Sequence, residues 1–350
     1  MAEVAMPLST QAKTEYADAC SEAVYVHQSV GVAPIAQGIL SLTGEDRVGF
    51  VHNVSSNDVR SLTPGQGCMT LLLTPKGKIL FPLAVLASAD RLDLVVDEPL
   101  IIPLKNLMES SLIMEDVAID DRSSAWRFFH LAGKALPELM SALDLQQPSG
   151  KEFTWKSQAG VILVNRRRTA VSGVDVGVAA ADADGWFEKA AETARRLGGG
   201  PVGTIAQDIL RIEAAIPKFG VDFTTDHFPQ EAALEDRAVS FTKGCYTGQE
   251  IVARIKTYGG VNRRLVGIVI DGPAPGPGDK VFHEGAESGR ITSAARSIRF
   301  SKAVAMAMVA KDSAASGTVL QVASPDGPIA AVTDIASPQA FLAFLESCPK

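Results

Sequence analysis

Long hydrophobic runs, an excess of basic charge and clustered cysteines are all missing from this chain of 350 residues. No apolar stretch approaches the ~18 residues that a membrane-spanning helix requires. The formal net charge of −7 and the isoelectric point near 5.4 argue against a general binder of nucleic acid or anionic membrane, since both need a basic surface. Residues 1–21 lack the basic and apolar regions of a secretory signal. We therefore expect a cytoplasmic protein that binds neither nucleic acid nor membrane.

Cysteine is sparse and dispersed. Cys20, Cys68, Cys245 and Cys348 lie far apart and form no C-x-x-C pair. This dispersal argues against a disulfide framework, a zinc ribbon or an iron–sulfur cluster held by this chain alone. The five histidines show neither H-x-x-x-H nor H-E-x-x-H spacing, so a catalytic zinc is not supported. The sequence predicts no resident metal.

The length and the 46% hydrophobic content are ample for two or three domains, each with its own core. A Pro-Lys-Gly turn between apolar runs at 68–73 and 79–87 predicts a β-hairpin. Turn-dense residues 272–278 precede short apolar runs that predict a small β-barrel or sandwich. Further strands are expected at 92–96 and 161–165, and helices at about 43–53, 99–110, 136–143, 186–197 and 204–215. The expected class is α+β with a C-terminal β module.

One segment, Lys243–Glu250 (KGCYTGQE), places a cysteine between a cation and an expected helix start. Thr247 and Glu250 form a capping-box pattern, which predicts Thr247 as the N-cap. The helix dipole and the nearby Lys243 would favour the thiolate form of Cys245. The alternative is a buried structural cysteine.

Other charged residues have ordinary explanations. Arg166–Arg168 follows the strand expected at 161–165, and we interpret it as a solvated edge that discourages strand pairing. Arg254 lies four residues after Glu250, the spacing of a simple helical ion pair. Gly198–Gly200 is interpreted as a helix stop, because neither G-x-G-x-x-G nor a Walker motif is present.

Several segments together resemble a known family. RIEAAIP at 211–217, FPQE at 228–231, KGCYTGQE and Arg263–Leu265 occur in the order and spacing of the YgfZ family. The resemblance extends over nearly the whole chain, through TGED at 43–46, Asn57-Asp58, PKGK at 75–78 and SGRITS at 288–293. That family is similar to the glycine-cleavage T protein, an aminomethyltransferase.

The resemblance implies a three-lobed cloverleaf of the aminomethyltransferase folate-binding type. Residues 1–260 would form two interleaved α+β lobes, and residues 261–350 a C-terminal β-barrel. The central channel would bind tetrahydrofolate or a derivative. The implied role is an accessory one in the assembly or repair of iron–sulfur clusters, mainly of [4Fe–4S] enzymes. Cluster-carrier proteins and client enzymes would be the partners.

The resemblance also implies site residues. Cys245 and Lys243 would be the catalytic pair of a functional motif that comprises Lys243, Gly244, Cys245, Tyr246, Gly248, Gln249 and Glu250. Glu213 matches the glutamate that meets the pterin in the T protein, and a carboxylate suits the amino-pyrimidine edge. Phe219 matches a lip tyrosine and could still stack. Arg263 and Arg264 are candidates for the anionic glutamyl tail, with surface ion pairing as the alternative.

Departures from the T protein limit its chemistry. Its G-G-x-x-D-D strand carries an aspartate that assists aminomethyl transfer, whereas residues 77–82 here read GKILFP, without a carboxylate. Acid–base assistance of that kind is typically worth ~10²-fold or more. Three functions therefore stay open, and the sequence does not decide whether the protein turns over a substrate. They are the iron–sulfur accessory role, a folate-dependent aminomethyl or one-carbon transferase, and a non-catalytic folate-responsive scaffold in which Cys245 is structural.

Overall fold

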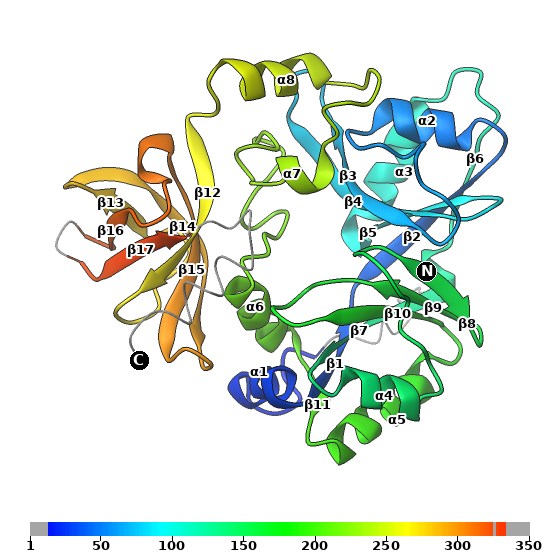
Figure 1. The fold of residues 1–350 in the computed structure, drawn as a ribbon, viewed down its shortest axis with the longest axis horizontal. Coiled ribbons are helices and arrows are strands. Elements are labelled where there is room, and N and C mark those ends of the chain that lie inside the picture. The colour runs from blue at the N-terminus through cyan, green and yellow to red at the C-terminus, as the bar shows by residue number, and fades with distance from the viewer. Residues whose placement is uncertain (1–12, 325–326, 334–350) are drawn as a thin grey trace, which may run out of the picture.

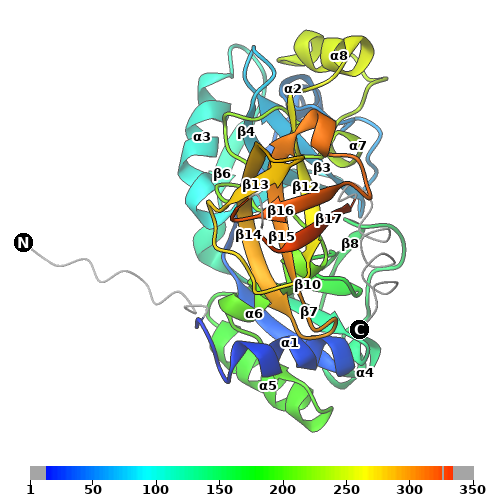
Figure 2. The ribbon, with the colours of Figure 1, turned by 90° about the vertical axis from the view of Figure 1, so that its left-hand side faces the viewer.

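Three lobes surround the centre of the molecule in the computed structural model, which describes residues 13–324 and 327–333. Figure 1 shows two α+β lobes beside one another and a barrel across from them. Figure 2, from the side, places the barrel in front of the two sheets. Cys348 lies outside the described residues. No helix of the described ranges combines the length and apolar character needed to cross a bilayer.

The first lobe is built on a six-stranded sheet in the order β11-β1-β7-β10-β9-β8, in which only β1 and β11 pair in parallel. Alternate residues of β1 and β7 face opposite sides, so α4 and α5 cover one face and α1 and α6 the other. The strands are β1 (Val30–Ile35), β7 (Trp126–Gly133), β8 (Trp155–Gln158), β9 (Val161–Asn165), β10 (Gly173–Ala179) and β11 (Gly200–Pro201). The helices are α1 (Ala19–Gln28), α4 (Leu136–Ala142), α5 (Ala183–Arg196) and α6 (Thr204–Glu213).

The second lobe is an antiparallel sheet in the order β3-β4-β5-β2-β6, covered by α2 and α3. The two sheets pack against one another through Ile39, Leu86, Phe128 and Trp155. Its strands are β2 (Gln37–Thr43), β3 (Gly67–Leu73), β4 (Ile79–Ala87), β5 (Leu92–Asp97) and β6 (Ala118–Asp121), and its helices are α2 (Arg47–Val54) and α3 (Ile101–Ser110).

The expected hairpin is present between β3 and β4. The Gly77 amide donates to the Thr74 carbonyl at 2.8 Å, which closes the turn, and Gly77 adopts a positive φ of 75°. Two helices lie between this lobe and the barrel, α7 (Glu235–Ala238) and α8 (Gln249–Tyr258). The chain then enters the barrel directly at Arg263.

The third lobe is a closed six-stranded barrel in the order β12-β15-β14-β13-β16-β17, so the C-terminal β module is a barrel and not a sandwich. Closure comes from β12, which pairs with both β15 and β17. Alternate apolar residues of these strands fill the interior. The strands are β12 (Arg263–Ile270), β13 (Lys280–His283), β14 (Ala286–Ser297), β15 (Lys302–Ala310), β16 (Val319–Val322) and β17 (Ile329–Thr333).

Candidate functional site

A central cavity of about 650 Å³ lies between the two α+β lobes, and its volume is within the ~300–1,000 Å³ typical of small-molecule sites. Its walls come from both sheets, from α6 and from the loop at 216–223. Much of the wall is apolar and aromatic, including Phe128, Phe153, Phe219 and Phe223. Phe219 and Phe223 meet edge to face, with ring centroids 5.4 Å apart. The structure therefore places Phe219 where a planar ligand could stack on it.

The interpretation of Arg166–Arg168 as a solvated edge is wrong. β9 is an interior strand, paired with β8 and β10, and all three arginines line the cavity. The Arg166 guanidinium pairs with Glu152 at 2.8 Å and lies over the Phe153 ring. Burial lowers the pKa of Arg166 to about 10, so its charge persists at neutral pH. The cavity thus has a cationic wall beside its aromatic one.

A buried polar cluster supports this cationic wall. Asp175 accepts hydrogen bonds from Arg168, at 2.8 and 2.9 Å, and from the Nδ1–H of His130, at 2.8 Å. Burial alone would raise the pKa of the Asp175 carboxyl, but Arg168 and His130 hold it well below its usual range. Burial also lowers the pKa of His130, so its imidazole is neutral. Arg168 is therefore fixed in place by an ionised partner.

Glu213 does not line the cavity. It is 1% exposed, and its Oε2 lies 2.7 Å from Nε2 of His27 on α1. The face of α6 that turns toward the cavity carries Gln207, Asp208 and Arg211 instead. The geometry therefore gives no support to a pterin contact by Glu213.

Arg263 and Arg264 also lie outside the cavity lining. Arg263 pairs with Glu231 at 2.9 Å, and Arg264 pairs with Glu235 at 2.8 Å. Through these pairs β12 is connected to the loop that carries Glu231 and to the start of α7 at Glu235. Both residues therefore form ion pairs, which is the alternative to binding a glutamyl tail that the sequence left open.

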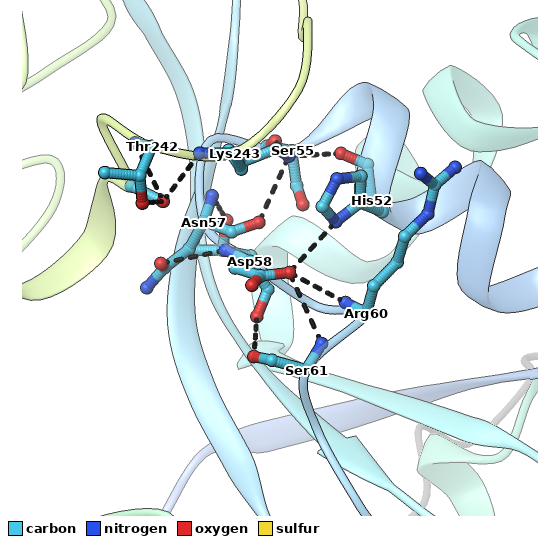
Figure 3. A network of polar contacts seen from close by, with 10 residues as sticks. His52, Ser55, Asn57, Asp58, Arg60, Ser61, Thr242 and Lys243 are labelled. Atoms are coloured by element: carbon cyan, nitrogen blue, oxygen red, sulfur yellow. Dashed lines mark hydrogen bonds and ion pairs between the residues drawn. The ribbon is translucent and has the colours of Figure 1, made fainter.

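Within KGCYTGQE, Lys243 reaches away from the thiol. Its Nζ donates to the backbone carbonyls of His52, Ser55 and Asn57, the last two at 2.6 and 3.1 Å, and so joins the motif to the end of α2 (Figure 3). Burial lowers the pKa of Lys243 to about 8, which leaves the ammonium as the main form at pH 7. None of its hydrogen bonds goes to Cys245, so its role in the structure is to hold the loop.

The capping-box prediction is wrong. The N-cap of α8 is Gly248, at a positive φ of 81°, and no side chain caps this helix. A Cβ at Gly248 would lie 2.5 Å from the Thr74 carbonyl oxygen, so only glycine fits against the hairpin turn. Gln249 begins α8, and the exposed Glu250 pairs with Arg254 at 2.9 Å, as its spacing indicated.

Cys245 is exposed, unlike its neighbour Tyr246, which is buried in an apolar cluster. The thiol lines a surface pocket of about 470 Å³ together with His52 and Arg60. Burial, followed by Lys243 and Arg60, lowers the pKa of His52, and its Nδ1 makes no hydrogen bond despite lying 3.4 Å from Asp58. Figure 3 shows His52 and Arg60 on the same side of Asp58, with the His52 ring directed toward the Asp58 carboxylate. A neutral imidazole and an exposed guanidinium thus accompany the thiol, and the sequence indicated neither.

The thiol pocket and the central cavity are separate. They share no lining residue, and a core cluster that contains Tyr246 and Phe223 lies between them. Phe223 contributes to the cavity wall, whereas Tyr246 contributes to the pocket. The structure therefore brings Phe219 to one site and Cys245 to another.

This arrangement defines a three-lobed protein of the aminomethyltransferase fold, with a cavity of small-molecule size between its two α+β lobes. Residues 4–243 match the GCVT N-terminal domain, and residues 263–338 match the glycine cleavage T-protein C-terminal barrel domain. The chain belongs to the glycine-cleavage T-protein family.

Named relatives cover most of the chain. An aminomethyltransferase of Bacillus subtilis (strain 168) is 27% identical over 297 residues, which are 81% of this chain and 80% of the relative. An aminomethyltransferase of Thermotoga petrophila is 28% identical over 322 residues, 90% of this chain and 87% of the relative. A chloroplastic protein of Arabidopsis thaliana whose name proposes a transferase is 28% identical over 261 residues, 73% of this chain but only 59% of that protein.

A solved structure shows the same fold. The glycine cleavage system aminomethyltransferase T from Bartonella henselae superposes with a TM-score of 0.84. The match covers 93% of this chain and 90% of that one, at 21% sequence identity. The expected aminomethyltransferase fold with a C-terminal β-barrel is confirmed, and the barrel has six strands.

Proposed function

We propose that this protein is a member of the YgfZ branch of the family. It binds a tetrahydrofolate in the central cavity and acts in the cytoplasm on the assembly or repair of iron–sulfur clusters, mainly in [4Fe–4S] enzymes. Cys245 is the acting thiol, in contact with a sulfur or cluster that a carrier protein or client enzyme holds. The residues of the cavity fit a folate, because an aromatic wall for the ring system lies beside a cationic wall for carboxylates.

The observation that carries the proposal is the exposure of Cys245. Lys243, Tyr246 and Gly248 each have a structural contact that fixes the loop, whereas the thiol is exposed beside His52 and Arg60. An accessible thiol near a cation and a neutral imidazole is the setting in which cysteine becomes reactive. A thiol on the outside can also reach a partner protein, which one inside the cavity could not.

Complementation tests the proposal. In a strain that lacks its own protein of this branch, wild type should restore [4Fe–4S] enzyme activity and Cys245→Ala should not. Cys20→Ala, which removes another exposed cysteine, is the matched control and should behave as wild type. Normal enzyme activities with Cys245→Ala would contradict the proposal and favour the folate-responsive scaffold.

A one-carbon transferase is the second candidate, and a specific observation keeps it in view. Pro82 lines the cavity near the place where the T protein has its aspartate. The absence of a carboxylate at this position argues against aminomethyl transfer. Asp97, however, also lines the cavity, is exposed and makes no side-chain hydrogen bond or ion pair among the described residues, although its charge acts on Arg168. If this candidate holds, 5,10-methylenetetrahydrofolate should form from an aminomethyl donor, and Asp97→Asn should abolish its formation.

A further inference from the structure

The basic wall of the cavity carries more positive charge than its neighbours neutralise. Arg166 and Arg237 share a single carboxylate, Glu152, at 2.8 and 3.1 Å. Arg168 pairs with Asp175 at 2.8 Å. Around the whole cavity five arginine and lysine side chains face three aspartates, in a chain whose net charge is −7. The lining is thus locally cationic on an acidic protein.

Among the described residues, Arg167 is the cavity-lining cation whose side chain has no hydrogen-bonded or ion-paired carboxylate. Its side chain lines the cavity and is half-buried, yet within the described ranges its guanidinium makes no hydrogen bond or ion pair. Its backbone amide donates to Glu152 at 3.3 Å, and the Glu152 charge acts on the guanidinium without a hydrogen bond or ion pair to it. Burial and then the proximity of Arg237 lower the pKa of Arg167, so its surroundings disfavour the charge. Arginine nevertheless stays protonated in proteins, and the charge is left unpaired.

An unpaired, partly desolvated charge is costly, and a ligand anion would remove the cost. The guanidinium fork matches a carboxylate through two parallel N–H bonds, which an ammonium cannot reproduce. Arg166 and Arg168, the neighbours of Arg167 in the sequence, are each held by a carboxylate. The position of the unpaired group is therefore defined before any ligand enters.

We propose that Arg167 binds a carboxylate of the glutamyl tail of the ligand, so that the cavity selects glutamylated folates over the corresponding pteroate. This inference rests on the proposed folate site and names the part of the ligand that sets specificity. It moves tail recognition away from Arg263 and Arg264, whose charges are taken by Glu231 and Glu235.

The test compares two ligands on three proteins. Anaerobic calorimetry would measure the affinities of tetrahydropteroylglutamate and of tetrahydropteroate, which lacks the glutamate, for wild type, Arg167→Gln and Arg195→Gln. Arg195 is a matched control, an exposed arginine on α5 outside the cavity. Wild type and Arg195→Gln should bind the glutamate form about 10- to 100-fold more tightly, as expected for one charge-assisted pair. Arg167→Gln should lose this preference and keep its affinity for the pteroate.

Thermal unfolding of the ligand-free proteins separates recognition from support of the fold. Arg167→Gln removes an unpaired charge, so its melting temperature should equal or exceed that of wild type. Arg168→Gln should melt lower, because it strips Asp175 of its cation.

Each other result is decisive. A wild-type preference retained in Arg167→Gln, equal wild-type affinities for the two ligands, or an equal loss of both ligands in Arg167→Gln would overturn the inference and leave folate binding intact. Failure of wild type to bind either ligand would overturn the proposed folate site, and the inference with it.

Discussion

At the scale of single residues, glycine decides how the Cys245 loop meets the hairpin. Gly248 and Gly77 both adopt positive φ, and a Cβ on Gly248 would lie 3.0 Å from the Gly77 Cα. Their contact brings the start of α8 onto the turn at Thr74. Gly244, by contrast, has nothing within 4 Å of an added Cβ and no positive φ. Backbone conformation and contact thus require glycine at position 248 but not at position 244.

Gly248→Ala should lower the free energy of unfolding by about 1–3 kcal/mol, because it combines left-handed strain with a clash against the Thr74 carbonyl. Gly244→Ala is the matched control and should change it by less than about 0.5 kcal/mol, as ordinary surface substitutions do. Urea unfolding of the two variants and wild type provides the measurement. Equal stability of the two variants would refute the assigned contact.

At the scale of elements, one bulge joins the barrel to α6. The register of β14 against β15 shifts between Ile291 and Ser293, and consecutive hydroxyls then reach the same carboxylate. Thr292 and Ser293 both donate to Asp222 Oδ1 at 2.6 Å, while Arg211 on α6 donates to its Oδ2 at 2.7 Å. The SGRITS segment, noted in the sequence only as a resemblance, therefore serves to attach one lobe to another.

Asp222→Ala should destabilise the protein by about 3–5 kcal/mol, because it removes the carboxylate from a buried pair and leaves the Arg211 charge without it. Asp208→Ala removes the half-exposed partner of the same arginine and should cost less than about 1 kcal/mol. Denaturant unfolding followed by far-UV circular dichroism measures both. Similar losses for the two variants would show that Asp222 is not the joint between the lobes.

The two central strands of the first sheet, β7 and β10, should make stability fall in acid. Burial places the pKa of His130 below the ~6.5 of an unfolded histidine, so from about pH 6.5 downward the unfolded chain takes up a proton that the native state refuses. The Asp175 carboxyl, also held below its usual pKa, adds a second loss below about pH 4. Both effects destabilise as pH falls.

His130→Gln isolates the first of these losses. The difference in unfolding free energy between wild type and His130→Gln should shrink as pH falls from about 7 to 5, because only wild type carries this histidine. The loss below about pH 4 should remain in both proteins. A difference that stays constant across that range would show that His130 titrates normally in the folded state.

Elements with clear local signals were predictable from the sequence, and buried strands carrying polar residues were not. The hairpin follows from its turn residues, and β9, β15 and β17 follow from apolar runs. No strand was predicted at β10, because Asp175 and two glycines interrupt its alternating valines. Asp175 is bound by Arg168 and His130, which come from other segments of the chain. Only the fold therefore shows why a carboxylate can be buried there.

At the scale of the whole molecule, the family fold was predictable from the sequence, but which residues line each site was not. Phe219 and Cys245 line the two sites described above, whereas the charges of Glu213, Arg263 and Arg264 are occupied by local partners. Sequence proximity to a motif does not reveal which face of a helix or strand meets a cavity. The basic run Arg166–Arg168 was missed for the same reason.

The separation of the two sites is the central feature of this account. A folate in the cavity would lie behind the core cluster that contains Tyr246, while Cys245 faces outward. Binding and thiol chemistry should therefore be separable by mutation. Any influence of the ligand on the thiol would have to pass through the packing of this cluster.

Tetrahydrofolate titration of wild type and Cys245→Ala, together with complementation by the same two proteins, tests that claim most directly. We predict that Cys245→Ala binds tetrahydrofolate as tightly as wild type and fails to restore iron–sulfur enzyme activity. Phe219→Ala, which acts in the cavity, should weaken tetrahydrofolate binding and serves as the positive control for the titration. Loss of tetrahydrofolate affinity in Cys245→Ala would contradict the account, because it would show that the thiol and the ligand share one site.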